Sequence, residues 1–419
     1  MERLAYFCVL VFAASAFVLP ALANAALIVA AMLLLARPTA AWQRLRGHPL
    51  WPVLGLALGY LLLHAALLPT ADVPSTASRN ALLDLLKLLL LVPVGWAVAG
   101  DPRRARALLA LAGAGLLLRL LLHAPPGQWL AVFGDPTRRL DFGFTAIASG
   151  LYCAAALLGL LLLLPGRVPG TGWTRAATLL GGLLAATLLT AGLLASRSRA
   201  TWLALLLASP IVLAATGRHG RPALALLGAG VLATVLVGGS AVAHRLGADA
   251  AAYPALTRVL GAHDAVAADD AWQQMPYNSL GLRLHVWRAA IEAWWQRPWL
   301  GHGAGASEAL LAGAANTPLG ALSHLHNTYA ELALRFGLIG LLLAGAMVAT
   351  LAAGVVRRGR EDRAMDDLVR LLAAVLVLTA IWSASDFRLF RLDFRFYVVL
   401  LAGVALGLGL PRRCPPCAS

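Results

Sequence analysis

The sequence predicts an all-α, polytopic membrane protein with about twelve transmembrane helices and one large soluble segment on a single side of the membrane. Three observations support this prediction. Of the 419 residues, 60% are hydrophobic and only 13% are charged, whereas a soluble domain carries about 25% charged residues. The apolar residues form runs close to the ~20 residues that a bilayer core requires. Basic residues lie between these runs in twos and threes, which is typical of membrane-flanking segments.

The apolar runs fall at twelve places along the chain. They are 5–20, 21–36, 51–69, 81–99, 105–122, 142–165, 176–195, 200–216, 222–243, 329–354, 368–385 and 396–410. Only Pro20 and Asn24 interrupt the stretch that holds the first two, and A-L-A-N-A at 21–25 resembles a signal-peptidase site. Cleavage there would leave the next run crossing in the same direction, so both readings give one topology, and we favour the uncleaved chain.

Basic residues in the short loops indicate the orientation, because cytoplasmic loops are enriched in Lys and Arg. With the N-terminus inside, every cytoplasmic loop is basic: Arg37, Arg44, Arg46; Arg103, Arg104, Arg106; Arg167, Arg175; Arg218, Arg221; the run 357–363; and Arg412, Arg413. The exceptions on the outside lie close to helix ends: Arg138, Arg139; Arg197, Arg199; and Arg388, Arg391, Arg395. Positive charges on the outside oppose the charge rule that sets the orientation of the helices, which suggests that these arginines have a chemical role. We therefore predict a bacterial inner-membrane protein with both termini in the cytoplasm.

One large polar segment, 244–327, separates the first nine runs (1–243) from the last three and a cytoplasmic tail (328–419). We expect it to be a periplasmic subdomain with amphipathic helices. Within it, Leu284, Trp287, Ile291 and either Trp294 or Trp295 recur at helical spacing, which predicts a helix lying on the membrane surface.

Nothing in the sequence predicts a metal, a cofactor or a nucleic acid. P-loop, dinucleotide-binding and H-E-x-x-H motifs are missing from it. Cys414 and Cys417 form a lone C-P-P-C at the C-terminus, which is weak support for a metal site. Although the net charge is +15, the charges are not gathered on one soluble face as nucleic-acid binding requires. The expected surroundings are membrane lipids.

Arginine and histidine side chains gather on the predicted outer side. Arg199 opens the eighth run, Arg283 and Arg288 lie on the surface helix, and His324 and His326 precede the tenth run. Arginine binds phosphate with a planar fork of donors, and a neutral histidine can take a proton from a hydroxyl. Such a set suits a pyrophosphate leaving group and an attacking hydroxyl. Taken singly, each arginine is more often an interfacial anchor and each histidine more often structural.

A pair of ionisable residues lies inside the fourth apolar run. Asp84 and Lys87 are three residues apart and can therefore meet on one helix face. Ionisable groups inside a membrane are candidates for function, but a structural ion pair explains these two equally well.

Three motifs resemble the O-antigen ligase and polymerase superfamily of bacterial envelope polysaccharide enzymes. They are S-R-A-T-W-L at 198–203, S-L-G-L-R-L-H-V-W-R-A-A at 279–290 followed by P-W-L-G-H-G-A-G at 298–305, and H-N-T-Y-A-E-L-A-L-R-F-G-L-I-G at 326–340. In this resemblance, Arg199 and Arg283 stand at the positions of the superfamily's arginines in the first two motifs, and His326 stands at the position of its histidine in the third. The stretch R-R-L-D-F-G-F-T at 138–145 matches loosely, because it lacks a Pro-Asn pair. Arg335 stands where many members carry an acid, and we assign it no function.

The resemblance implies a GT-C-like, metal-independent membrane glycosyltransferase that needs no cofactor. Its donor would be an undecaprenyl-pyrophosphate-linked glycan and its acceptor a hydroxyl of the lipid A core. It implies that His326 is a general base and that Arg199 and Arg283 bind the pyrophosphate. The substrate-binding residues implied in addition are His324, Arg288, Arg139, Arg138, Asn327 and Tyr329.

Within the superfamily, the single late loop ending in H-x-H-N favours a ligase over a polymerase, and a protein O-oligosaccharyltransferase is a further alternative. A polysaccharide-lipid transporter is the alternative from another class. It would predict paired broken helices with charges near mid-membrane. Only Asp84, Lys87 and single proline breaks fit that pattern. The glycan, the acceptor sugar and the oligomeric state are not encoded in these motifs.

Overall fold

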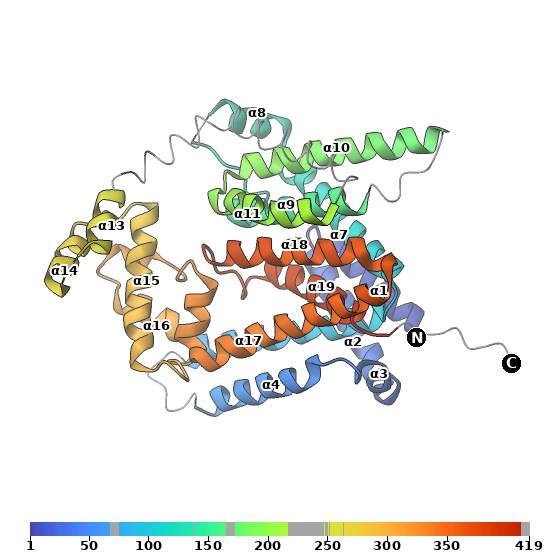
Figure 1. Cartoon of the computed structure of the whole chain (residues 1–419), viewed down its shortest axis with the longest axis horizontal. Coiled ribbons are helices and arrows are strands. Elements are labelled where there is room, and N and C mark those ends of the chain that lie inside the picture. The colour runs from blue at the N-terminus through green and yellow to red at the C-terminus, as the bar shows by residue number, and fades with distance from the viewer. Residues whose placement is uncertain are drawn as a thin grey trace.

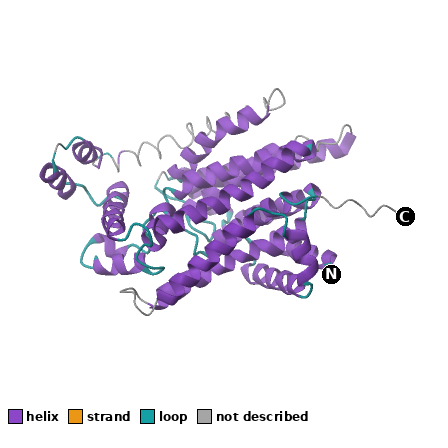
Figure 2. Cartoon of the chain, turned by 60° about the horizontal axis from the view of Figure 1, so that its bottom comes forward, coloured by secondary structure: helices purple, strands orange, loops and turns teal. Residues whose placement is uncertain are grey.

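A computed structural model of the chain describes residues 1–67, 75–135, 137–164, 172–216, 247, 250, 252–262 and 264–411. The described part consists of helices joined by loops and turns, with no strand in these ranges (Figure 2). This confirms the predicted all-α class. The ninth predicted run, 222–243, and the C-P-P-C tail lie outside the described residues.

The helices follow the predicted apolar runs closely. Up to residue 216 they are α1 (Glu2–Ser15), α2 (Pro20–Leu35), α3 (Pro38–Leu45), α4 (Leu50–Leu67), α5 (Ser75–Leu86), α6 (Leu91–Val98), α7 (Pro102–His123), α8 (Pro126–Gly134), α9 (Ala146–Leu163), α10 (Gly172–Ser196) and α11 (Arg199–Thr216). After it come α13 (Ala252–Leu260), α14 (Ala265–Gln273), α15 (Ser279–Gln296), α16 (Ala306–Gly313), α17 (Thr328–Glu361), α18 (Asp366–Ser383) and α19 (Leu392–Leu408). A 3-10 turn, Lys87–Leu90, joins α5 to α6.

Six helical stretches of the described chain are long and apolar enough to cross a membrane, or up to seven if the bent pair α2 and α3 counts as one span. The predicted number of twelve is therefore not confirmed. Several of the other helices are short, since α1, α2 and α19 have 14, 16 and 17 residues. In addition, α18 begins with charged residues, among them Asp366, Asp367 and Arg370.

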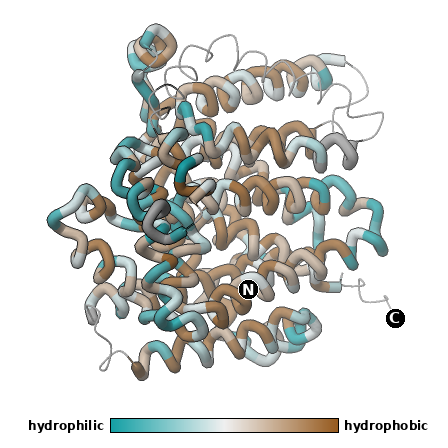
Figure 3. The backbone as a smooth tube through the Cα atoms, turned by 60° about the vertical axis from the view of Figure 1, so that its left-hand side comes forward, coloured by the Kyte–Doolittle hydropathy of each residue, from teal (hydrophilic) through white to brown (hydrophobic). Residues whose placement is uncertain are grey.

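The long helices lie side by side, and the short helices α13 to α16 gather at one end of them, opposite the N-terminus (Figure 1). Hydrophobic residues dominate the long helices (Figure 3). The described residues of 244–327 form a group of helices at one end of the bundle; that they make up a periplasmic subdomain stays a prediction.

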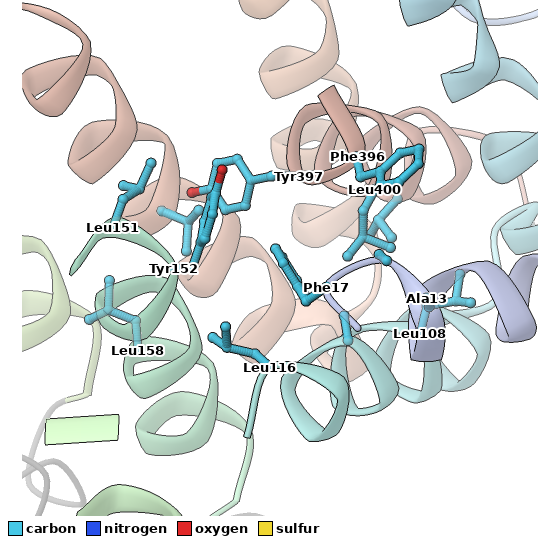
Figure 4. Packing of buried hydrophobic residues seen from close by; sticks show 14 of the residues in the cluster. Ala13, Phe17, Leu108, Leu116, Leu151, Tyr152, Leu158, Phe396, Tyr397 and Leu400 are labelled. Atoms are coloured by element: carbon cyan, nitrogen blue, oxygen red, sulfur yellow. The ribbon is translucent and has the colours of Figure 1, made fainter. Parts of the chain in front are cut away.

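The main core lies where α1, α7, α9 and α19 meet. Phe17, Tyr152 and Tyr397 form a chain of ring contacts there, with centroids 5.1 and 5.4 Å apart (Figure 4). Burying aromatic side chains of this size stabilises a fold strongly. This core brings the ends of α9 and α19 together, and the loops that precede these two helices carry candidate site residues.

Helix α15 runs across the direction of the long helices (Figure 1), and its inward face differs from the predicted apolar stripe. The fully buried side chains are Val286 and Ala290, whereas Ile291 and Trp295 are 51% and 66% exposed. Ile291 and Trp295 are therefore not part of the inward face, and their predicted place against a membrane surface stays a prediction. The buried face uses small side chains because α15 packs closely on α17 and α16.

The predicted pair of Asp84 and Lys87 is confirmed, with 2.8 Å between Lys87 Nζ and Asp84 Oδ1. Arg395 of α19 also pairs with Asp84. Two cations on one carboxylate tie α5 to α19, which supports the structural interpretation of this pair.

Helix α17 is kinked at Gly337, which has a φ of +63° and a non-helical ψ. At the kink, Leu338 N–H donates to Pro298 O (2.8 Å), and His302 N–H donates to Leu334 O (2.9 Å). The segment 298–303 thus satisfies backbone groups that the kink removes from the helix ladder.

Gly337→Ala should destabilise the protein, because a Cβ at this position would lie 2.1 Å from Trp299 O and the residue has a positive φ. We expect a loss of about 1–3 kcal/mol from backbone strain alone. Gly345→Ala, in the same helix with nothing within 4 Å of an added Cβ, is the matched control and should be neutral or stabilising. Thermal unfolding in detergent measures both, and equal midpoints for the two variants would contradict this account of the kink.

Candidate active site

Four loops meet at the end of the bundle near α13 to α16: 135–145, 196–199, 322–327 and 384–391. Hydrogen bonds join these loops, directly or through the helix residues next to them. Leu140 N–H donates to Ala195 O (3.0 Å), Arg388 Nη1 donates to Thr145 Oγ1 (3.0 Å), and Thr328 Oγ1 donates to Asp386 O (2.9 Å). Candidate residues far apart in the sequence therefore lie at one place.

The centre of the site is a cluster of His324, His326 and Asp386, whose ligand-type atoms lie within 4.8 Å of one another. Asp386 Oδ1 lies 3.6 Å from His326 Nδ1 and 3.7 Å from His324 Nε2, and its side chain is only 5% exposed. Burial opposes ionisation of Asp386, but its contact with His326 and the positive charge that a protonated imidazole would carry outweigh burial and lower the pKa of the carboxyl. Asp386 is therefore an anion facing two imidazoles.

His324 is held neutral. Burial, followed by repulsion from His326, lowers its pKa to about 4. Its Nδ1 accepts the backbone N–H of His326 at 3.1 Å, so the proton of the neutral ring belongs on Nε2, toward Asp386. A metal bound at Nε2 would require the opposite tautomer. The contact with His326 N–H thus favours an acid–base cluster over a metal site.

His326 has a left-handed backbone conformation with a φ of +53°, which is costly for a side chain other than glycine. The preceding residue, Leu325, is held on both sides: its N–H donates to Glu331 Oε1 (2.8 Å), and its carbonyl accepts the Trp287 indole N–H (2.8 Å). With Nδ1 directed at Asp386, Nε2 of His326 is left as the basic nitrogen. A carboxylate behind one nitrogen and a base at the other is the arrangement of an oriented general base.

Arg283 lies on α15, which contacts the histidine loop through Trp287. It lies one turn before Trp287, whose indole contacts Leu325, and residues four apart share a helix face. Its Nη1 is 3.4 Å from Ser279 Oγ. The fold therefore places Arg283 on the side of α15 that faces the histidine loop.

Arg199 and Arg139 form a second group of positive charge. Partial burial and the charge of Arg199 lower the pKa of Arg139, so the two guanidiniums lie close enough to repel each other. Arg199 begins α11, and Ser198 and Thr201 beside it are hydrogen-bonded at 2.9 Å. Two neighbouring arginines are a suitable site for a phosphate group.

Other candidates have partners within the protein. Arg288 pairs with Asp269 (3.0 Å) and Glu292 (2.7 Å), and Arg138 pairs with Asp135 (3.3 Å). Asn327 caps α17 by accepting the N–H groups of Tyr329 and Ala330. The Tyr329 hydroxyl donates to Ala380 O (2.7 Å). These contacts give the four residues structural roles, and their predicted part in substrate binding stays a prediction.

Sequence reasoning missed Asp386. Its loop also carries Arg388, which pairs with Asp393 at 2.9 Å while bonding Thr145. The sequence does hold a signal for Asp386, because Arg388 is one of the outer arginines that oppose the charge rule for orientation. Asp386 lies two residues before this arginine and could have been proposed as a candidate on that ground.

The pH dependence of stability tests the buried state of His324. Its pKa is about 4 in the folded protein and near 6.5 when unfolded, so between these values the unfolded state binds more protons. Stability should therefore fall as the pH is lowered from 7 to 5. In His324→Gln this fall should be smaller, when measured as the thermal midpoint in detergent. An identical pH dependence in His324→Gln would contradict the assignment.

The fold and the site define a helical membrane protein with histidine, aspartate and arginine gathered at one end of its helices. Residues 183–345 match the family model described as O-Antigen ligase. The match takes in less than half of the chain but includes Arg199, Arg283 and His326, and it confirms the resemblance to the O-antigen ligase family. A membrane glycosyltransferase-like enzyme follows from it. Comparison with curated proteins gave no match.

Proposed function

We propose that this protein is an O-antigen ligase that transfers a glycan from undecaprenyl pyrophosphate to a hydroxyl of the lipid A core oligosaccharide. The observation that carries the proposal is the oriented base: His326 with Asp386 at Nδ1, 3.6 Å away. This base lies in the region that matches the ligase family. A glycan-transfer enzyme with an activated donor needs such a base and a cationic site for the leaving group.

In the proposed reaction, His326 Nε2 takes the proton of the acceptor hydroxyl. The hydroxyl oxygen attacks the anomeric carbon from the face opposite the pyrophosphate, which inverts that carbon. The bond from the anomeric carbon to the pyrophosphate oxygen breaks, and its electron pair stays with undecaprenyl pyrophosphate. Arg199 and Arg283 neutralise the charge that develops on this leaving group, with Arg139 beside Arg199. Asp386 stabilises the imidazolium of His326.

The activated linkage of the donor supplies the free energy, so the reaction needs neither ATP nor a cofactor. Guanidinium groups take the part that a divalent cation plays in other phosphate sites, so we expect transfer to be metal-independent. The site would face the periplasm of a bacterial inner membrane, with both termini in the cytoplasm, in keeping with the basic loops expected inside.

A reconstituted assay with wild-type protein tests the class of reaction. The protein is mixed with an undecaprenyl-pyrophosphate-linked glycan, with or without lipid A core, in EDTA and without ATP, and products are separated by size. Glycan transfer to the core supports the ligase. Lengthening of the lipid-linked glycan without core would instead indicate a polymerase, and transfer to a pilin-type protein a protein O-oligosaccharyltransferase. No product from folded protein would favour a polysaccharide-lipid transporter.

A further inference from the structure

A cavity of about 510 Å³ lies between the end of α4 and the segment that follows α15. Its lining includes His64, Gln296, Arg297, Trp299 and His302. None of these residues belongs to the histidine and arginine site described above. The proposed transfer reaction therefore gives this cavity no role.

The wall of the cavity is a rigid backbone segment. Gly301 and Gly303 have φ values of +72° and +98°, which only glycine adopts without strain. These turns let Gly303 N–H donate to Arg335 O (3.0 Å), while Ile339 N–H donates to Trp299 O (3.3 Å). The segment is thus fastened to α17 on both sides of its kink, which leaves the cavity preformed.

Its side chains offer three kinds of contact. His64 is 6% exposed, and its Nε2 has no hydrogen-bond partner in the described chain. A buried imidazole nitrogen without a partner is costly, and a hydroxyl entering the cavity would supply one after a small shift of the ring. Trp299 is 62% exposed and presents an apolar face to which a sugar ring can pack. Arg297 makes no ion pair with any described residue and can bind a phosphate.

Exposed leucines continue from the cavity along α4. Leu62, Leu63 and Leu67 are 71%, 44% and 43% exposed, on a helix long and apolar enough to cross a membrane. Such a surface faces hydrocarbon chains. The cavity therefore lies where a lipid carries its polar headgroup, at the edge of an apolar helix face.

We propose that this cavity binds the phosphorylated sugar headgroup of the acceptor glycolipid. This inference rests on the proposed function and identifies where the acceptor is held. Trp299 packs under a sugar ring, Arg297 binds its phosphate, and His64 pairs with a hydroxyl. The acyl chains of the glycolipid lie along the exposed leucines of α4.

The position of the cavity relative to His326 suits this role. The cavity segment contacts α17 from Leu334 onward, the seventh of the 34 residues of that helix. From Thr328, where α17 begins two residues after His326, the rise to Leu334 is roughly 9 Å at 1.5 Å per helical residue. A glycolipid held by its membrane-proximal sugar can thus extend its outer sugars to the base.

Binding to the purified full-length protein in nanodiscs tests the proposal. The probes are lipid A carrying its core, the same lipid after dephosphorylation, and an undecaprenyl-pyrophosphate-linked glycan. Trp299→Ala should weaken binding of core lipid A about tenfold or more. Trp295→Ala is the matched control, because Trp295 is also exposed, at 66%, and does not line the cavity; it should leave the Kd unchanged. Arg297→Gln should remove the preference for the phosphorylated probe.

Equal dissociation constants of wild type and Trp299→Ala for core lipid A would overturn the proposal. If the undecaprenyl-linked glycan displaced bound core lipid A as well as unlabelled core lipid A does, the cavity would be assigned to the donor and the proposal would also fail. Transfer assays separate this failure from failure of the proposed function. If the cavity does not bind acceptor, wild-type protein still transfers glycan; if the protein is not a ligase, the wild type makes no product whatever the cavity binds. At saturating acceptor, Trp299→Ala should recover the wild-type kcat while its KM for acceptor stays raised.

Discussion

Replacing His326 by alanine is expected to lower the rate of glycan transfer by about 10²–10⁴-fold, the contribution typical of a general base. The expected loss is in kcat, because His326 acts on the proton that moves as the new bond forms. His326→Asn is a second variant, since asparagine tolerates the left-handed conformation of this residue (φ +53°) but cannot take the proton. Initial rates of transfer to lipid A core measure both variants.

Asp386→Asn should lower the rate of glycan transfer, but less than His326→Ala does. The change removes the anion 3.6 Å from His326 Nδ1 and keeps the size of the side chain. His285→Gln is the control: His285 bonds Met275 O through Nε2 at 3.0 Å and stacks on Tyr277, outside the cluster. Wild-type rates in His326→Asn would contradict the assignment of the base, and full activity in Asp386→Asn would remove Asp386 from it.

Arg335→Met should destabilise the protein by about 3–5 kcal/mol, the usual cost of breaking a buried ion pair from one side. Arg335 is 1% exposed and its Nε donates to Glu331 Oε2 at 2.7 Å, while Glu331 is fully buried. The Arg335 guanidinium also lies 5.0 Å from the Phe390 ring. Its loss would leave a buried carboxylate without its cation.

Two further variants decide whether the ion pair is the cause. In Glu331→Gln with Arg335→Met, no buried charge remains, and part of the lost stability should return. Arg288→Met breaks pairs with exposed acids and should cost less than about 1 kcal/mol. Unfolding in denaturant with detergent gives these differences. An Arg335→Met variant no less stable than Arg288→Met would show that the pair does not hold the fold.

Arg335 also shows why part of the site lay beyond sequence reasoning. The motif at 326–340 predicted His326 correctly as a residue at a helix start, since Asn327 caps α17. It could not show that Glu331 and Arg335, one turn apart, form an internal pair that holds Leu325. Arg335 therefore received no role from the sequence, and its pairing with Glu308 of α16 is visible only in three dimensions.

Apolar runs predicted the helices well, because membrane helices must satisfy their own backbone and carry long hydrophobic segments. The number of spans that they predicted is not confirmed, because six stretches of the described chain, or up to seven with the bent pair α2 and α3, are long and apolar enough to cross a membrane. The helices α1 and α2, with 14 and 16 residues, are shorter than the ~20 residues of a typical span. Asp386 was missed because its importance comes from two histidines about sixty residues earlier in the chain, and no local pattern records that contact.

The stereochemistry of a single transfer tests the central claim most directly. Wild-type protein is given a donor whose first sugar has a defined anomeric configuration, and the linkage formed to lipid A core is determined by NMR. The account predicts inversion, because His326 activates the acceptor for one direct displacement of the pyrophosphate. Retention of configuration would require a covalent glycosyl intermediate and two displacements, and would contradict the role assigned to His326 and Asp386.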